Sequence, residues 1–323
     1  MERIKFYDIL KGLAIWIVAF EHSLLAMNPI AHDSTLSNAI QLIQMPLFIA
    51  ISGYFFYPSI AKNTFMGNLK KKFKHLYLPS LCWGIIGACM MLAFKIITHK
   101  EIDVSYFVYL VFTGMWFLTA LFLLSVIGAI LYEYLRKYFY TACFFVFTIL
   151  YFIPSAWMIN EIKFLLPFFV MAIFCSKWNW QSVPVWLFVL SFILFFVAVN
   201  IYDWSFTLYS MGDMHILTWE FLYKTIVRLI GGISGIVCML YLNKYIVRIK
   251  YLNASLLYIG GVTLPIYVLH QKFLMSSTIL NYHTNNLFII CMVSVIIILL
   301  SILSYKILRH KFFRKYLFGE TGK

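Results

Sequence analysis

The segment DILKGLAIWIVAFEHSLLAM, residues 8 to 27, decides the fold class because it is apolar enough to enter a bilayer and still carries ionisable side chains. These are Asp8, Lys11, Glu21 and His22. Each charge near the centre of a bilayer costs roughly 2.5–3.5 kcal/mol on insertion scales. Because a helix that serves only as an anchor does not normally carry several such groups, we expect a functional segment.

The spacing of three of these residues places them along one side of a helix. Asp8 and Lys11 are one turn apart. Lys11 and His22 are eleven residues apart, which returns to within about 20° of the same face over roughly 16 Å. The sequence therefore predicts a polar track through a membrane helix. A simpler interpretation treats Asp8 and Lys11 as interfacial anchors and leaves only Glu21 and His22 to explain.

The whole chain has a membrane composition. Of its 323 residues, 63% are hydrophobic and 12% are charged, whereas soluble domains have about 45–50% apolar and about 25% charged residues. We predict an all-α polytopic membrane protein that forms one domain over residues 1–323, with no soluble domain. The six cysteines lie in apolar segments without metal-binding spacing, so no metal is expected.

About ten segments are long and apolar enough to span a bilayer. They lie near 9–27, 36–57, 76–98, 106–132, 139–155, 162–176, 183–202, 219–241, 255–276 and 287–308, and Pro154 and Pro167 interrupt the fifth and sixth. With the N-terminus inside, the outer loops hold only Lys100 and Lys163 as basic residues. The positive-inside rule then predicts both termini in the cytoplasm, with a basic amphipathic tail at about 309–323. Topology thus explains the net charge of +14 better than nucleic-acid binding does.

Two stretches near the cytoplasmic side have alternative interpretations. Ser52 and Gly53 lie among aromatic residues, which favours either close helix packing or a gap beside a substrate channel. The following loop reads NLKKKFKHLYLP, and its Lys72 and His75 are three apart and could share a face. Together with Lys74 they could form an anion site for a phosphate-bearing ligand, or contact anionic lipid.

On the outer side, Trp116 follows a loop and is either an interfacial belt residue or part of a pocket wall. The outer loop 203–218 mixes aromatics with Asp213 and His215, which would suit a sugar but is also ordinary for an outside loop.

Two later segments carry further ionisable groups. Glu220, Lys224 and Arg228 recur at four-residue intervals and share a helix face, with Glu220 and Lys224 as a favourable pair. Arg228 then needs a partner within the membrane, for which Glu220 and Glu21 are both candidates. His270 follows Pro265, which should kink or end the ninth helix.

Five stretches, in this order, resemble the integral-membrane acyltransferase 3 family: DILKGLAIWIVAFEH, MPLFIAISGYFF, KKFKHLYLPSLCW, WFLTALF and LPIYVLHQKF. That family transfers acyl groups, often acetyl, onto cell-surface polysaccharides, lipopolysaccharide, peptidoglycan and related exported molecules. It typically has ten core helices and a basic residue eleven positions before a histidine in the first helix. The resemblance covers most of the chain.

The resemblance implies roles for particular residues. His22 matches the essential histidine of the family, Lys11 stands where arginine is commoner, and Ser52–Tyr54 matches its SGF or SGY signature. Lys72 and His75 stand where the family often has two arginines before a proline. They keep some positive charge, but neither side chain can bind a phosphate through two parallel hydrogen bonds as arginine does.

The mechanism that the resemblance implies is O-acyl transfer from cytosolic acyl-CoA, acetyl-CoA first among the candidates, to a glycan hydroxyl. The predicted donor-binding residues are Asp8, Lys11, Lys72, Lys74 and His75. The predicted pocket residues are Ser52, Gly53, Tyr54, Trp116 and His270, and the acceptor-side residues are Asp213, His215, Glu220, Lys224 and Arg228. His22 would be the general base or the acyl carrier, with Glu21 or another carboxylate to orient it.

The expected setting is the inner cell membrane, with the lipid bilayer and a glycan or lipid-linked glycan as partners and a homo-oligomer as an option. A transporter or flippase of a lipid-linked glycan or anionic substrate uses the same features, although we find no internal repeat that would favour it. A non-catalytic scaffold would leave the intramembrane charges unexplained.

Overall fold

The computed structural model describes residues 5–60, 62–99, 101, 103–154, 158–207, 218–278, 283–308 and 310–320. Within these ranges every regular element is a helix, so the predicted all-α fold is confirmed. Asp213 and His215, predicted on the acceptor side, lie outside the described residues.

The chain forms two compact units. The first unit comprises Met1–Phe55 and Pro167–Lys306, and the second comprises Phe56–Leu166 and Ile307–Lys323. Each unit has its own helix packing, and the residues of the polar track on the first helix all belong to the first unit.

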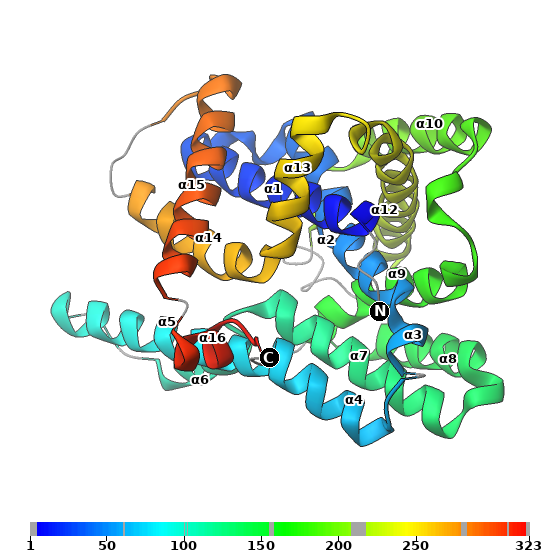
Figure 1. Ribbon diagram of the computed structural model, residues 1–323, viewed down its shortest axis with the longest axis horizontal. Coiled ribbons are helices and arrows are strands. Elements are labelled where there is room, and N and C mark those ends of the chain that lie inside the picture. Colours follow the sequence, from blue (N-terminus) through cyan, green and yellow to red (C-terminus); the bar gives the residue numbers. More distant parts are fainter. Residues whose placement is uncertain are drawn as a thin grey trace. The chain divides into compact units, whose positions relative to one another are not determined.

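The first unit is built around α1 (Lys5–Met27). Helices α2 (Thr35–Tyr54), α12 (Trp219–Ile246), α13 (Lys250–Gly261) and α14 (Thr263–Thr278) all pack on α1. In Figure 1, α13 in yellow crosses α1 in dark blue. The remaining elements are η1 (Pro29–Asp33), the second half of α9 (Ile159–Phe174), η4 (Cys175–Lys177), η5 (Trp180–Ser182), α10 (Val185–Ile201), η6 (Trp204–Phe206) and α15 (Leu287–Ile307).

The second unit contains the basic stretch of the sequence. Its elements are α3 (Phe56–Ile60), α4 (Phe65–Lys72), the π-helical segment η2 (Phe73–Tyr77), α5 (Leu78–Ile97), α6 (Val104–Thr113), α7 (Trp116–Tyr134), η3 (Arg136–Tyr138), α8 (Phe139–Phe152), the first half of α9, and α16 (Lys311–Leu317). The indole of Trp83 in α5 donates to the carbonyl of Leu317 at 2.9 Å, which attaches α16 to this unit.

Seven helical stretches among the described residues are long and apolar enough to cross a membrane. They are Lys5–Met27, Thr35–Tyr54, Phe65–Ile97, Trp116–Tyr134, Ile159–Lys177, Trp219–Ile246 and Leu287–Ile307. The pair α13 and α14, bent by 85°, is an eighth candidate. The chain is therefore a multi-pass membrane protein, while the count of ten spans and the cytoplasmic termini stay predictions.

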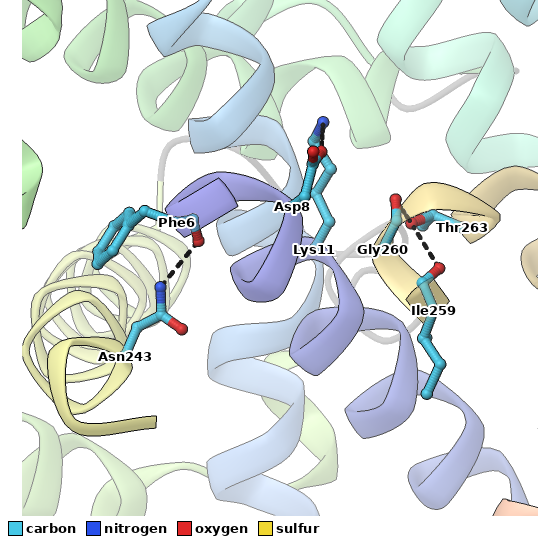
Figure 2. Close-up of polar contacts among 7 residues, drawn as sticks. All are labelled: Phe6, Asp8, Lys11, Asn243, Ile259, Gly260 and Thr263. Atoms are coloured by element: carbon cyan, nitrogen blue, oxygen red, sulfur yellow. Dashed lines mark hydrogen bonds and ion pairs between the residues drawn. The ribbon is translucent and has the colours of Figure 1, made fainter. Parts of the chain in front are cut away.

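Two glycines bring α1 and α13 into backbone contact. A Cβ added at Gly260 would lie 1.8 Å from the carbonyl oxygen of Asp8, and Gly12 faces α13 almost as closely. Small residues of this kind let membrane helices approach each other. On another side of α1, the Asn243 amide donates to the carbonyl of Phe6 at 2.9 Å (Figure 2). The Lys5 end of α1 is therefore held by two other helices.

The predicted span 106–132 is two helices, α6 and α7, so that prediction is wrong. Met115 between them has non-helical backbone angles, φ −113° and ψ 64°. Gly114 weakens the helix at this point because glycine loses most conformational freedom on ordering. The Ser80 hydroxyl donates to the Met115 carbonyl at 3.3 Å, which satisfies a backbone group at the break.

The prolines act differently from one another. Pro154 follows the end of α8 at Phe152, as predicted. Pro167 lies inside α9, which runs on from Ile159 to Phe174, so the predicted interruption there is wrong. Neighbouring groups in membrane proteins commonly satisfy the backbone around such a proline. Pro265 lies in the first turn of α14, directly after the bend, where its missing N–H leaves no intrahelical bond unmade.

Candidate active site

At the Lys5 end of α1, two residues of the predicted track form an ion pair. The Nζ of Lys11 lies 3.3 Å from Oδ1 of Asp8, as expected for residues one turn apart (Figure 2). The Asp8 side chain is 6% exposed and that of Lys11 is 34% exposed. Lys11 also lies 5.9 Å from the ring centroid of Phe55. The pair balances charge within the helix while the Lys11 side chain stays partly exposed.

At the Met27 end, the adjacent Glu21 and His22 face different helices. Glu21 is 3% exposed, and its Oε2 accepts a hydrogen bond from Nε2 of Gln44 in α2 at 2.9 Å. The His22 ring faces α14, where the ring of His270 lies 5.2 Å away between centroids. The amide nitrogen of Gln271 lies 3.5 Å from Nε2 of His22. The step of about 100° per residue explains why the carboxylate and the imidazole point apart.

His270 is the predicted pocket residue that the structure places beside His22. It is fully buried, and its Nδ1 lies 3.0 Å from the carbonyl oxygen of Ile266, one turn earlier in α14. This bond fixes the ring orientation and places the proton of a neutral ring on Nδ1. On His22, a hydrogen bond from the Gln271 amide requires a lone pair on Nε2. The site therefore offers a ring nitrogen that can accept a proton.

A row of amides on α2 was missed by sequence reasoning. Asn38, Gln41 and Gln44 follow at three-residue intervals and share one face. Gln44 bonds Glu21, Gln41 accepts from the Tyr202 hydroxyl at 3.1 Å, and Asn38 donates to the Tyr202 carbonyl at 2.6 Å. The signal was present, because three uncharged polar residues at helical spacing inside an apolar span indicate a buried polar contact.

The predicted acceptor-side residues of α12 are Glu220, Lys224 and Arg228. The Nζ of Lys224 lies 2.7 Å from Oε1 of Glu220, which confirms the predicted pair. Arg228 donates to the Tyr202 hydroxyl at 3.4 Å and to the carbonyl of Phe206. These bonds attach α12 to the segment that follows α10, and they connect Arg228 through Tyr202 to the amide row.

The contacts of Ser52, Gly53 and Tyr54 are those of helix packing. A Cβ added at Gly53 would lie 2.5 Å from the carbonyl oxygen of Phe169 in α9. The Ser52 hydroxyl bonds back to its own helix at 3.0 Å. Tyr54 stacks on Tyr7 with ring centroids 4.7 Å apart. A role beside a substrate channel stays a prediction for these three residues.

The basic residues predicted to bind the donor lie in the second unit. A cavity of about 290 Å³ is lined by Gly67, Lys70, Lys71, Lys74 and His75. Lys72 instead lines a separate small cavity with Asn68. The segment Phe73–Tyr77 is π-helical, and Lys72 and His75 line different cavities. Trp116, at the start of α7, also belongs to this unit, and the relation of these residues to His22 stays a prediction.

The chemistry available around His22 is that of imidazole, amide and carboxylate groups. Within the part of the chain that the structure describes, no three His, Cys, Asp or Glu side chains come together in a way that could hold a metal ion. An imidazole with an available lone pair is suited to accept a proton from a hydroxyl group.

Comparison with protein families gives the reaction class. The model of a family described as an acyltransferase domain, the acyltransferase 3 family, matches residues 4–306. The chain belongs to this acyltransferase family. It is therefore a membrane acyltransferase, which decides between the enzyme and the transporter interpretations.

This acyltransferase is also similar to nodulation protein NolL of Mesorhizobium japonicum. The two are 25% identical over 190 residues, which is 56% of this chain and 50% of NolL. The chain thus spans about half the length of this curated relative. No solved structure matches the acyltransferase.

Proposed function

We propose that this acyltransferase moves an acyl group from cytosolic acyl-CoA to a hydroxyl of a surface or exported glycan. The proposed donor is acetyl-CoA. The observation that carries the proposal is the His22 imidazole. It lies within a membrane helix of an acyltransferase and faces a second imidazole and an amide donor. Such a group inside a membrane span is functional by default.

In the proposed reaction His22 is the general base. Its Nε2 takes the proton of the acceptor hydroxyl while the oxygen attacks the thioester carbonyl carbon. A C–O bond forms, the C–S bond breaks, and His22 passes the proton to the thiolate sulfur. The products are the acylated glycan and CoA in its thiol form. A His22 that carries the acyl group itself would give a covalent acyl-imidazole before the acceptor reacts.

The donor side of the proposal uses positive charge. The phosphates of CoA are anionic, and Lys11 is a partly exposed cation at the Lys5 end of α1. Lys74 and His75 line the basic cavity of the second unit, and Lys72 lies nearby in sequence. We assign these cations, with Asp8 to hold Lys11 in place, to recognition of the donor.

The acceptor side of the proposal uses hydrogen-bonding groups around α12. Glu220, Lys224 and Arg228 share one face of that helix, and Asp213 and His215 precede it in the sequence. Polar and charged side chains of this kind hydrogen-bond the hydroxyls of a glycan. We place the enzyme in the inner cell membrane, with the bilayer and the glycan as its partners.

The test is transfer of labelled acetyl groups from acetyl-CoA to cell-envelope glycan in membrane vesicles. We expect His22→Ala to lower turnover by about 10²–10⁴-fold, the usual contribution of a general base. The control is His99→Ala, an exposed histidine of the second unit that should retain wild-type transfer. Acetyl-CoA should raise the melting temperature of both variants, because ligand binding stabilises the folded state.

Two results would contradict the proposal. Normal transfer by His22→Ala would remove the base assignment. Absence of transfer by the wild type, together with no thermal stabilisation by CoA, would remove acyl-CoA as donor.

A further inference from the structure

The ring of His270 carries a nitrogen that the described contacts leave unused. Its Nδ1 lies against the Ile266 carbonyl, whereas its Nε2 is buried and has no hydrogen-bond partner among the described residues. An unpaired buried polar atom costs about 1–3 kcal/mol. Native proteins keep few such atoms, so one beside the proposed base indicates a role.

The surroundings of this nitrogen point to His22. The two rings are 5.2 Å apart between centroids and inclined by 36°. The ring of Tyr267, one of the other groups near His270, is further away at 6.0 Å. At this separation a small side-chain rotation brings a nitrogen of one imidazole toward a nitrogen of the other. Hydrogen bonds that serve a reaction are often long or misaligned until the substrates are bound.

We propose that His270 is a positioning residue whose Nε2 accepts a hydrogen bond from the His22 ring once His22 has taken the acceptor proton. The inference rests on the proposed function, in which His22 is the base. The proton taken at Nε2 goes on to the thiolate sulfur, so the bond to His270 comes from the other ring N–H of His22, which donates more strongly once the ring is charged. The proton stays on His22 until it reaches the thiolate sulfur, and His270 remains neutral throughout.

A neutral acceptor suits this position in a membrane. In serine hydrolase triads a buried carboxylate orients the histidine and stabilises its protonated form. Here the neighbouring carboxylate, Glu21, is turned toward Gln44. An imidazole acceptor avoids the cost of a second permanent charge near His22. Because His270 acts on the protonated state of His22, its loss should lower kcat and leave substrate binding unchanged.

A pair of matched substitutions isolates the unused nitrogen. In His270→Asn the side-chain NH₂ can replace Nδ1 as the donor to Ile266, and the Nε2 acceptor is removed. In His270→Gln the side-chain oxygen offers an acceptor close to the position of Nε2. The measurements are kcat, KM for acetyl-CoA and melting temperature, made on the purified full chain with labelled acetyl-CoA and the glycan acceptor.

We expect His270→Asn to lower kcat by at least about tenfold, a part of the effect of a general base, with KM within about twofold of the wild type. His270→Gln should recover most of the lost kcat. In the His22→Ala background, His270→Asn should cause no further loss, because residues that act as a unit are not additive. Should His270→Asn fail to fold, kcat is compared between His270→Gln, which offers an acceptor, and His270→Met, which does not.

The outcomes separate this inference from the proposed function. Wild-type kcat in His270→Asn, or a raised KM with equal losses in the Asn and Gln variants, would overturn the positioning role. A further loss in the His22→Ala background would overturn it as well. If His22→Ala keeps its activity, His22 is not the base, and the positioning role of His270 falls with it.

Discussion

The two ends of α1 accommodate ionisable groups in opposite ways. At the Lys5 end, Asp8 and Lys11 pair with each other at 3.3 Å within one helix. At the Met27 end, Glu21 and His22 turn to separate helices and contact an amide and an imidazole. A pair satisfied within its own helix needs no partner helix, whereas groups satisfied by neighbours depend on the assembled bundle. The comparison indicates that the arrangement of ionisable groups at the Met27 end depends more on the neighbouring helices than the arrangement at the Lys5 end does.

The largest expected effect comes from breaking the packing at the Lys5 end with Gly260→Val. The added Cβ would lie 1.8 Å from the backbone oxygen of Asp8, so the backbones of the two helices would have to move apart. Overpacking costs about 1–3 kcal/mol and occasionally more, and we expect the upper end here. Thermal unfolding in detergent should show a strongly lowered melting temperature, with activity lost in parallel.

The control for this substitution is Gly67→Ala in α4. Its added Cβ would lie 3.0 Å from the side-chain oxygen of Thr64, so it meets no backbone atom at that distance. Its melting temperature should stay close to that of the wild type. A Gly260→Val variant as stable as this control would show that α1 and α13 do not pack as described.

A smaller effect is expected from Glu21→Gln at the Met27 end. The new amide keeps an oxygen that can accept the bond from Gln44, so the fold should be retained. The ionisable carboxyl group next to His22 in the sequence becomes a neutral amide, which removes its contribution to stabilising the protonated ring. We expect turnover to fall about tenfold, less than for the base itself. A loss as large as that of His22→Ala would mean that the carboxylate acts directly in the reaction.

The smallest effect is expected at Lys11. In Lys11→Met the ammonium that we assign to the donor phosphates is removed, and KM for acetyl-CoA should rise about three- to tenfold, the size of a partly exposed charge interaction of about 1 kcal/mol. In Lys11→Arg the charge remains and KM should stay near the wild-type value. Turnover should be unchanged in both. A fall in kcat without a change in KM would mean that Lys11 acts in the transfer step itself. The two ends of α1 would then no longer differ in function, with one for donor binding and the other for catalysis.

Local features of the structure could be predicted from the sequence. The contact of Asp8 with Lys11 and the pair of Glu220 with Lys224 follow from helical spacing over three or four residues. The span of α1 follows from the length and apolarity of its segment. The direction of His22 away from Glu21 was not stated from the sequence, although the step of about 100° per residue explains it. These predictions succeeded because each interaction lies within one helix.

Features that depend on neighbouring helices could not be predicted in this way. The contact of His22 with His270 joins distant parts of the chain, and the tolerance of Pro167 depends on its surroundings. The break at Met115 is supported by Ser80 of another helix. By spacing Lys72 and His75 could share one face, whereas in the structure they line different cavities next to a π-helical segment.

The 85° bend between α13 and α14 determines where α14 places His270 relative to α1. Helix α13 contacts α1 through Gly260, and α14 carries His270 toward His22. At the bend, the Thr263 hydroxyl donates to the Gly260 carbonyl at 2.8 Å (Figure 2). A change in this angle would alter the distance between the two imidazoles while the Gly260 contact stays in place. In the proposed mechanism, this angle therefore helps to set the distance between His270 and His22, on which the proposed hydrogen bond depends.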